Sequence, residues 1–144
     1  MANKYEIYLG VDFGDARTGL ALSDPMGFLA TGAGCIRSGN LRKTAEETAA
    51  FAKEKGVARI IIGNPLNMNG TAGPRTERVK AYADLVSELS GIPVELLDER
   101  LTTVSAHRFL SDSGVSGKKR KNSVDELSAT LILQNYLDRN KNQK

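Results

Sequence analysis

Apolar and polar residues alternate near the start of the chain, which is the pattern of a β-strand with two different faces. Ile7, Leu9, Val11 and Phe13 share one face, and Asp12 falls on the other. A carboxylate in an apolar strand is costly unless it is paired or binds a cation. We therefore expect any functional site to be built around this strand.

Glycines follow this carboxylate closely. Gly14 and Gly19 permit a tight turn and a close approach by a phosphate or a metal ion, and a second, antiparallel strand is predicted at 17–22. In a metal-dependent nuclease, an Asp on such a strand holds a divalent ion. In a nucleotide-binding site, the turn binds the phosphates and the Asp contacts the magnesium ion bound to them. A plain hairpin, in which Asp12 only supports the turn, is the third interpretation. The short motif leaves all three open.

The remaining pattern predicts alternating helices and strands. Asn40 is expected to cap a helix that ends before Gly56, and Pro74 is expected to open another. The last helix is predicted to begin at Ser123, with an apolar stripe formed by Val124, Leu127, Leu131 and residues 133–137. Strands are predicted at 7–13, 17–22, 28–36, 58–63 and 94–97, helices at 41–55, 74–90, 102–111 and from 123 onward, and a flexible stretch at 112–122.

This order of elements implies an α/β fold. Hairpin-connected strands followed by alternating helices and strands predict a mixed five-stranded sheet with helices on both faces. Three strands should pair antiparallel, and the later ones should be parallel. The chain has 144 residues, so we expect one domain over 1–139 followed by a polar tail at 140–144.

Composition excludes several classes of site. The only cysteine is Cys35 and the only histidine is His107, so neither a disulfide framework nor a zinc site is expected. No signal peptide or membrane-length apolar run is visible. These features predict a cytoplasmic protein that does not interact with membranes.

Positive charge is concentrated at the C-terminal end. Residues 118–144 hold seven Lys or Arg against three acids, whereas the overall net charge is only +3. The run Lys118–Lys121 is either a solvated loop or a contact for a nucleic-acid backbone.

Acidic residues stand at three places that an open sheet brings together. Asp12 lies on the first strand, Asp98 and Glu99 follow the last strand, and Asp125 lies in the first turn of the predicted last helix. Sites gather at the carboxyl ends of parallel strands, so these side chains are expected to meet. Two like charges ~4 Å apart cost about 4 kcal/mol at an effective dielectric near 20. A divalent ion that binds the carboxylate oxygens turns this repulsion into a net attraction.

A structural role is the alternative for the last of these acids. Ser123 and Glu126 form a capping-box pattern, and Asp125 between them suits the helix dipole. The helix face that Asp125 begins is small, because Ser128 and Ala129 follow it. That face can lie close to a strand, and Gly10 beside Asp12 offers the matching gap.

Four motifs at characteristic spacing resemble those of the YqgF/RuvX family of ribonuclease H-like proteins, and the resemblance extends from Tyr5 to about Asp138. Ser128 departs from the family pattern, which usually has Ala there, and Asn69 stands where Asp is common. The matching segments are Gly10–Gly14 with Arg17–Ala21, Gly63–Leu66 with Asn69–Thr71 and Gly73–Arg75, Asp98–Thr103, and Lys121 with Val124–Asp125.

The resemblance implies a hydrolase that cleaves phosphodiester bonds with two divalent ions, Mg²⁺ or Mn²⁺. It assigns metal binding and catalysis to Asp12, Glu99 and Asp125, with Asp98 as the alternate to Glu99. The basic residues that would contact substrate phosphates are Arg17, Arg75, Arg100 and Lys121.

The substrate implied by the resemblance is the 5′ end of the precursor of 16S ribosomal RNA, or else a Holliday junction in DNA, which would require a homodimer for paired cuts. Two other classes remain open. One is an ATP-binding module of the actin and sugar-kinase type, which shares the core fold but normally needs two such domains. The other is a non-catalytic RNA-binding assembly factor.

Overall fold

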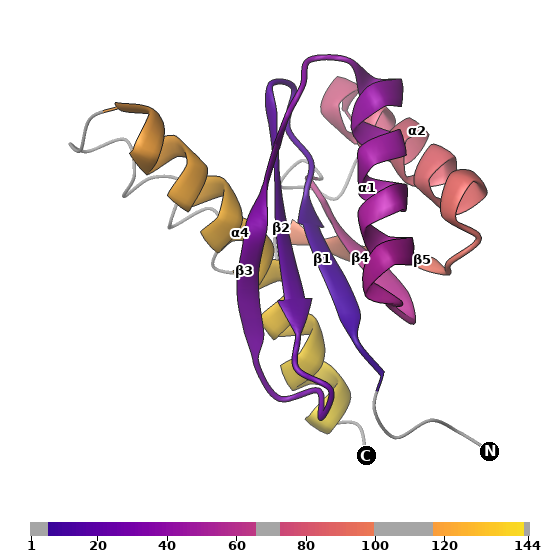
Figure 1. Ribbon diagram of the computed structural model, residues 1–144, viewed down its shortest axis with the longest axis vertical. Helices are drawn as coiled ribbons and strands as arrows, with labels where there is room; N and C mark the ends of the chain where they lie inside the picture. The colour runs from indigo at the N-terminus through magenta and orange to yellow at the C-terminus, as the bar shows by residue number, and fades with distance from the viewer. Residues whose placement is uncertain (1–5, 66–72, 100–116, 143–144) are drawn as a thin grey trace.

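A computed structural model describes residues 6–65, 73–99 and 117–142. In these ranges the chain forms five strands and three helices (Figure 1). Their order is β1 (Tyr8–Asp12), β2 (Arg17–Ser23), β3 (Ala30–Arg37), α1 (Leu41–Lys55), β4 (Arg59–Asn64), α2 (Pro74–Ser90), β5 (Val94–Asp98) and α4 (Gly117–Asn142).

The strands form one mixed sheet in the order β3-β2-β1-β4-β5. β1 pairs antiparallel with β2, and β2 pairs antiparallel with β3. β4 pairs parallel with both β1 and β5. The predicted topology is therefore confirmed.

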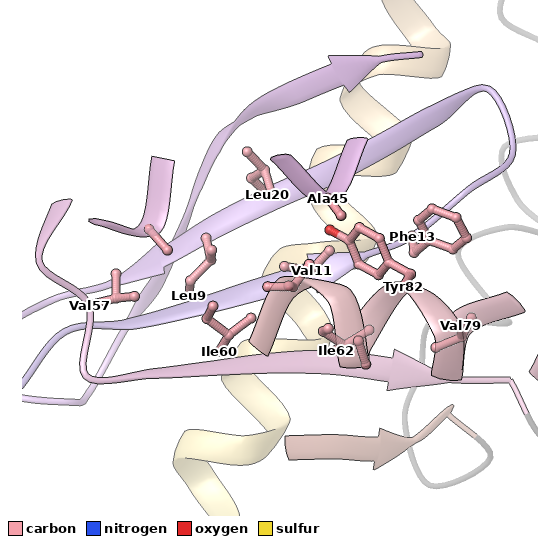
Figure 2. Packing of buried hydrophobic residues seen from close by; sticks show 13 residues of the cluster. Leu9, Val11, Phe13, Leu20, Ala45, Val57, Ile60, Ile62, Val79 and Tyr82 are labelled. Carbon is pink, nitrogen blue, oxygen red and sulfur yellow. The ribbon is translucent and has the colours of Figure 1, made fainter. Parts of the chain in front are cut away.

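Helices α1 and α2 cover one face of the sheet (Figure 1). Leu9 and Val11 of β1, and Phe13 just after it, lie in this layer, as their alternation predicts. Figure 2 shows the Phe13 ring against the Tyr82 ring of α2. The two rings stack with centroids 4.3 Å apart. The Tyr82 hydroxyl lies 2.6 Å from the Thr48 hydroxyl of α1, and burial raises the pKa of Tyr82. Phe13, which follows Asp12, is thus fixed by the core.

Helix α4 covers the opposite face at very short range (Figure 1). A Cβ atom at Gly10 would lie 2.6 Å from Leu133 Cβ and 2.9 Å from the Ala129 carbonyl oxygen, so only glycine fits there. The expected match between Gly10 and the small face of the last helix is confirmed.

The short apolar run in β4 is buried on both faces, as predicted. Ile60 and Ile62 pack toward α1 and α2, and Ile61 packs toward α4. All three are fully buried, which is typical of a strand with parallel neighbours. β4 therefore holds Gly63, which follows Ile62, in a fixed position near the carboxyl end of this strand.

The ends of α1 and α2 lie where the sequence predicts them. The Asn40 side chain accepts a hydrogen bond from the Lys43 backbone N–H at 2.8 Å, and Gly56 ends α1 with φ 65°. Pro74 opens α2, and Gly91 ends it with a positive φ of 70°. None of the helices in the described ranges is both long and apolar enough to cross a membrane.

The predicted start of the last helix is wrong. α4 begins at Gly117, so residues 117–122 are helical and Ser123 lies inside the helix rather than at its cap. Lys and Arg are good helix formers, and the run at 118–121 extends the helix through the capping-box pattern. Glu126 bonds the sheet instead, because its Oε2 accepts the Gly34 backbone N–H at 2.8 Å. The predicted helix at 102–111 lies outside the described residues.

The predicted apolar stripe of α4 is also partly wrong. Leu127 is 39% exposed, and Leu131 is only partly buried. The buried face is rotated by one residue because the helix approaches the sheet through its small side chains. It consists of Ser128, Ala129, Ile132, Leu133, Tyr136 and Leu137.

Candidate active site

Asp12 is the last residue of β1 and points toward α4, on the same face as Gly10. It is only 5% exposed. Its cross-strand partner on β2 is Gly19. On its other side lies Gly63 of β4, one residue beyond Ile62, which pairs with Val11. The Asp12 carboxylate therefore lies in a row across the sheet with a glycine on each side.

Asp125 of α4 lies directly over the first of these glycines. A Cβ atom at Gly19 would overlap the Asp125 carbonyl group. The Asp125 carboxylate accepts a hydrogen bond from Arg17, with 2.9 Å between Nε and Oδ2. Since Gly19 pairs with Asp12, the backbone places Asp125 beside Asp12 on the face that α4 covers.

Glu99 lies over the second glycine. A Cβ atom at Gly63 would be 3.1 Å from Glu99 Cγ, and Glu99 is 6% exposed. Asp98 pairs with Asn64 at the end of β5. Leu97 packs in the α4 core and Leu96 in the core on the other face, so alternation places Asp98 on the face opposite Asp12.

The three carboxylates fit hard divalent cations in their chemistry, because all their donor atoms are oxygens. Among residues 6–65, 73–99 and 117–142, no three His, Cys, Asp or Glu side chains lie close enough together to hold one ion. Asp12 occupies the middle of the row, with Glu99 on one side and Asp125 on the other. The row therefore has carboxylate oxygens, the kind of donor that holds divalent ions, on both sides of Asp12.

Two of the four predicted basic residues have described side chains, and one of these two lies at this row. Arg17 contacts Asp125, whereas Arg75 is exposed in the first turn of α2. Lys121 lies in an early turn of α4, in a segment whose side chains are not described, and Arg100 lies outside the described residues.

Sequence reasoning missed Arg78, which lies one turn after Arg75 on α2. Its Nε donates to Asp15 Oδ1 at 3.1 Å, and its guanidinium lies 5.9 Å from the centre of the Phe13 ring. Asp15 belongs to the turn that follows Asp12, so Arg78 adds positive charge at this end of β1. The sequence signal for Arg78 is its spacing of three residues from Arg75, because residues three apart are neighbours on one face of a helix.

Two further side chains near the row were not assigned a role from the sequence. Ser128 is fully buried on α4, and its hydroxyl makes no hydrogen bond in the described part of the chain. Cys35 of β3 pairs with Gly19. Burial is the main cause that raises the pKa of the Cys35 thiol, and the charge of Asp125 adds to it. Cys35 is therefore a poor nucleophile at neutral pH.

A family model described as "RuvX: Holliday junction resolvase" matches residues 6–139. The chain belongs to the RuvX family. A relative from Ruminiclostridium cellulolyticum, named "Putative pre-16S rRNA nuclease", is 48% identical to this RuvX family member over 132 residues, covering 91% of this chain and 93% of the relative. A Streptococcus agalactiae relative of the same name is 47% identical over 136 residues, covering 91% and 96%.

Solved structures confirm the fold of this RuvX family member. RuvC of T. thermophilus, in complex with a Holliday junction substrate, has a TM-score of 0.56 at 11% identity and covers 96% of this chain and 97% of its own. The Fowlpox virus resolvase with Holliday junction DNA has a TM-score of 0.52 at 12% identity and covers 92% and 97%. The predicted ribonuclease H-like fold class is therefore correct.

Proposed function

We propose that this protein is a metal-dependent nuclease that hydrolyses phosphodiester bonds at the 5′ end of the 16S rRNA precursor. The observation that carries the proposal is the row formed by Gly19, Asp12 and Gly63, with Asp125 and Glu99 lying over the two glycines. Membership of a family described as resolvases and the names of the close relatives support hydrolysis of nucleic acid.

Asp12, Glu99 and Asp125 would hold two Mg²⁺ or Mn²⁺ ions. Bound ions of this kind lower the pKa of a water nucleophile and stabilise the leaving oxygen. The protein contributes rigid placement, because Asp12 ends a strand that is paired on both sides. Glycines at 19 and 63 keep α4 and Glu99 close to it. Burial of Asp12 and Glu99 excludes water and strengthens electrostatic interactions at the row.

Asp98 is not part of this proposed set, because strand alternation directs it away from Asp12. Arg75, Arg100 and Lys121 are proposed to offset charge on substrate phosphates, and Arg78 joins them from its position beside Asp15. Arginine suits this role because its planar fork matches two phosphate oxygens.

Cleavage of Holliday junctions is the second candidate. The family description and the two structural neighbours with junction DNA favour it. It requires a homodimer, because a junction is resolved by paired cuts. Processing of rRNA requires only one active subunit, and we propose that a single domain over 1–139 carries it out in the cytoplasm.

A substrate panel tests these proposals. The purified protein is incubated with Mn²⁺ or Mg²⁺ and either a 5′-extended 16S precursor fragment or a four-way DNA junction. We expect the RNA to be cleaved, and we expect Asp12→Asn and Asp125→Asn to lower the rate about 100-fold or more. Asp84→Asn, which changes an exposed acid on α2, is the matched control and should retain the full rate.

Other outcomes would redirect the assignment. Cleavage of the junction alone would replace RNA by DNA as the substrate. RNA binding that survives both active-site substitutions, with no cleavage under any metal, would indicate an assembly factor and contradict a nuclease.

A further inference from the structure

The ion pair between Arg17 and Asp125 joins a basic residue predicted from the sequence to contact substrate phosphates and an acid proposed to hold a metal ion. Arg17 begins β2 and Asp125 lies on α4, 108 positions later in the chain. Their side chains are 34% and 22% exposed, and Nε lies 2.9 Å from Oδ2. The guanidinium thus uses an oxygen of a proposed metal ligand.

We propose that Arg17 and a divalent ion compete for the Asp125 carboxylate, and that ion binding releases the Arg17 guanidinium to contact a substrate phosphate. This inference rests on the proposed function, because it takes Asp125 as a metal ligand. It makes Arg17 a residue that couples metal binding to substrate binding.

Charge is the physical basis of the competition. Two cations on one carboxylate repel each other, and the low exposure of the neighbouring Asp12 limits screening by water. Arg17 has other donors and remains one-third exposed, so its guanidinium can turn toward solvent without leaving an unpaired charge in the core.

A purely structural role for the ion pair predicts the opposite effect. If Arg17 only fixes Asp125 for metal binding, its removal should weaken the binding of metal. If the two cations compete, its removal should strengthen it. The direction of the change in metal affinity therefore separates the two roles.

The first measurement is the Kd for Mn²⁺, determined by calorimetric titration of the full chain. We expect Arg17→Gln to lower this Kd about fivefold, which corresponds to loss of a partly exposed ion pair. Arg42→Gln is the matched control, because Arg42 pairs with Glu46 on the far surface of α1, and it should leave the Kd unchanged. In an Asp125→Asn background, Arg17→Gln should have no effect.

The second measurement is RNA affinity, followed by fluorescence anisotropy with EDTA or with Ca²⁺, another hard cation with oxygen ligands. Arg17→Gln should bind the precursor fragment as tightly as the wild type in EDTA, and about fivefold more weakly in Ca²⁺. An equal loss in both conditions would mean that Arg17 contacts RNA without release by metal, which would overturn the coupling.

Failure of the inference and failure of the proposed function give different results. If Asp12→Asn and Asp125→Asn leave the Mn²⁺ affinity unchanged, the metal site itself is wrong. If Asp125→Asn weakens Mn²⁺ binding but Arg17→Gln leaves it unchanged or weakens it, only the competition is wrong. Should Arg17→Gln fold poorly by circular dichroism, Arg17→Met, which keeps an apolar stem and removes the positive charge, must bind Mn²⁺ more tightly than the wild type.

Discussion

Individual side chains around the row of Gly19, Asp12 and Gly63 carry charged or polar groups in a largely buried setting. Asp12 is buried for its proposed chemistry, and Asp125 is balanced by Arg17. Ser128 lies fully buried on the same helix face as Asp125, with a hydroxyl that makes no hydrogen bond in the described part of the chain. A buried polar group of this kind lowers stability.

Replacement of Ser128 by Ala should raise the free energy of unfolding by about 1 kcal/mol, because the unsatisfied hydroxyl is removed at almost constant volume. Urea denaturation measures it. Ser87→Ala, on an exposed turn of α2, controls for the higher helix propensity of alanine. A gain no larger than that of the control would mean that the Ser128 hydroxyl is satisfied in solution.

Asp24 gives a prediction for pH. Its carboxylate accepts backbone N–H groups of Leu29, Phe28 and Met26, and these bonds, that of Leu29 first, lower the pKa of Asp24. Because the pKa of Asp24 is lower in the folded state, the ionised carboxylate stabilises the fold. This stabilisation is complete above the ordinary pKa of an Asp side chain, about 3.9, and it is lost as the pH falls through the folded-state pKa.

The stability difference between the wild type and Asp24→Asn should accordingly be largest near neutral pH and shrink below about pH 4. Urea unfolding of both proteins at pH 7 and pH 3 checks this. A difference that stays constant across this range would show that the carboxylate charge does not stabilise the turn at 24–29.

At the scale of elements, the site depends on how closely α4 approaches β1 and β2. The approach is possible because Gly10 and Gly19 have no side chains, so the helix backbone lies against the sheet. This contact sets the distance between Asp12 and the helix that carries Asp125.

A methyl group at this contact should separate the two elements. Gly19→Ala is expected to lower the free energy of unfolding by about 1–3 kcal/mol, the usual cost of overpacking. Gly39→Ala is the matched control, because its added Cβ would meet only the Asp15 carbonyl oxygen at an ordinary 3.6 Å. Equal thermal midpoints for the two variants would contradict the close packing.

Elements with strong local signals could be predicted from the sequence. Pro74 and Gly91 bound α2 where expected, and Asn40 caps α1. The start of α4 was not predicted, because the capping-box pattern at Ser123 is local and the helix continues through it. Boundaries of this kind depend on the helix propensity of the preceding residues, here Lys118–Lys121.

The acids proposed for the site could be selected from the sequence, but their arrangement in space could not be predicted from it. Alternation along β1 placed Asp12 correctly on the α4 face. The sequence left Asp98 and Glu99 as alternatives, because β5 ends at Asp98 and the strand pattern does not extend to Glu99. Glu99 is preferred in the proposal because it lies over Gly63. The contact of Arg17 with Asp125 spans 108 positions, and no local pattern encodes so distant a pair.

At the scale of the whole molecule, the acids proposed to hold metal and the basic run at 118–121 lie in different regions. The acidic row lies at the carboxyl ends of β1, β4 and β5, and the basic run at 118–121 lies in the first turns of α4. Figure 1 shows these turns extending past the edge of the sheet. We expect them to bind the nucleic-acid backbone without reading its sequence.

Binding of precursor RNA should therefore weaken as salt rises, and replacing Lys118, Lys119, Arg120 and Lys121 by Gln should flatten the dependence. The slope of log affinity against log salt should fall by about 0.7–0.9 for each residue that contacts a phosphate. Anisotropy titrations at several salt concentrations measure it. An unchanged slope would show that this run faces solvent only.

Asp12, Glu99 and Asp125 are proposed to hold two divalent ions at the row that Asp12 forms with Gly19 and Gly63. The most direct measurement is anomalous diffraction from crystals soaked in Mn²⁺. We expect two peaks about 4 Å apart next to the Asp12 carboxylate, and we expect both to be lost in Asp12→Asn. Peaks only elsewhere on the molecule, or no peak at the row, would show that these acids do not form the metal site.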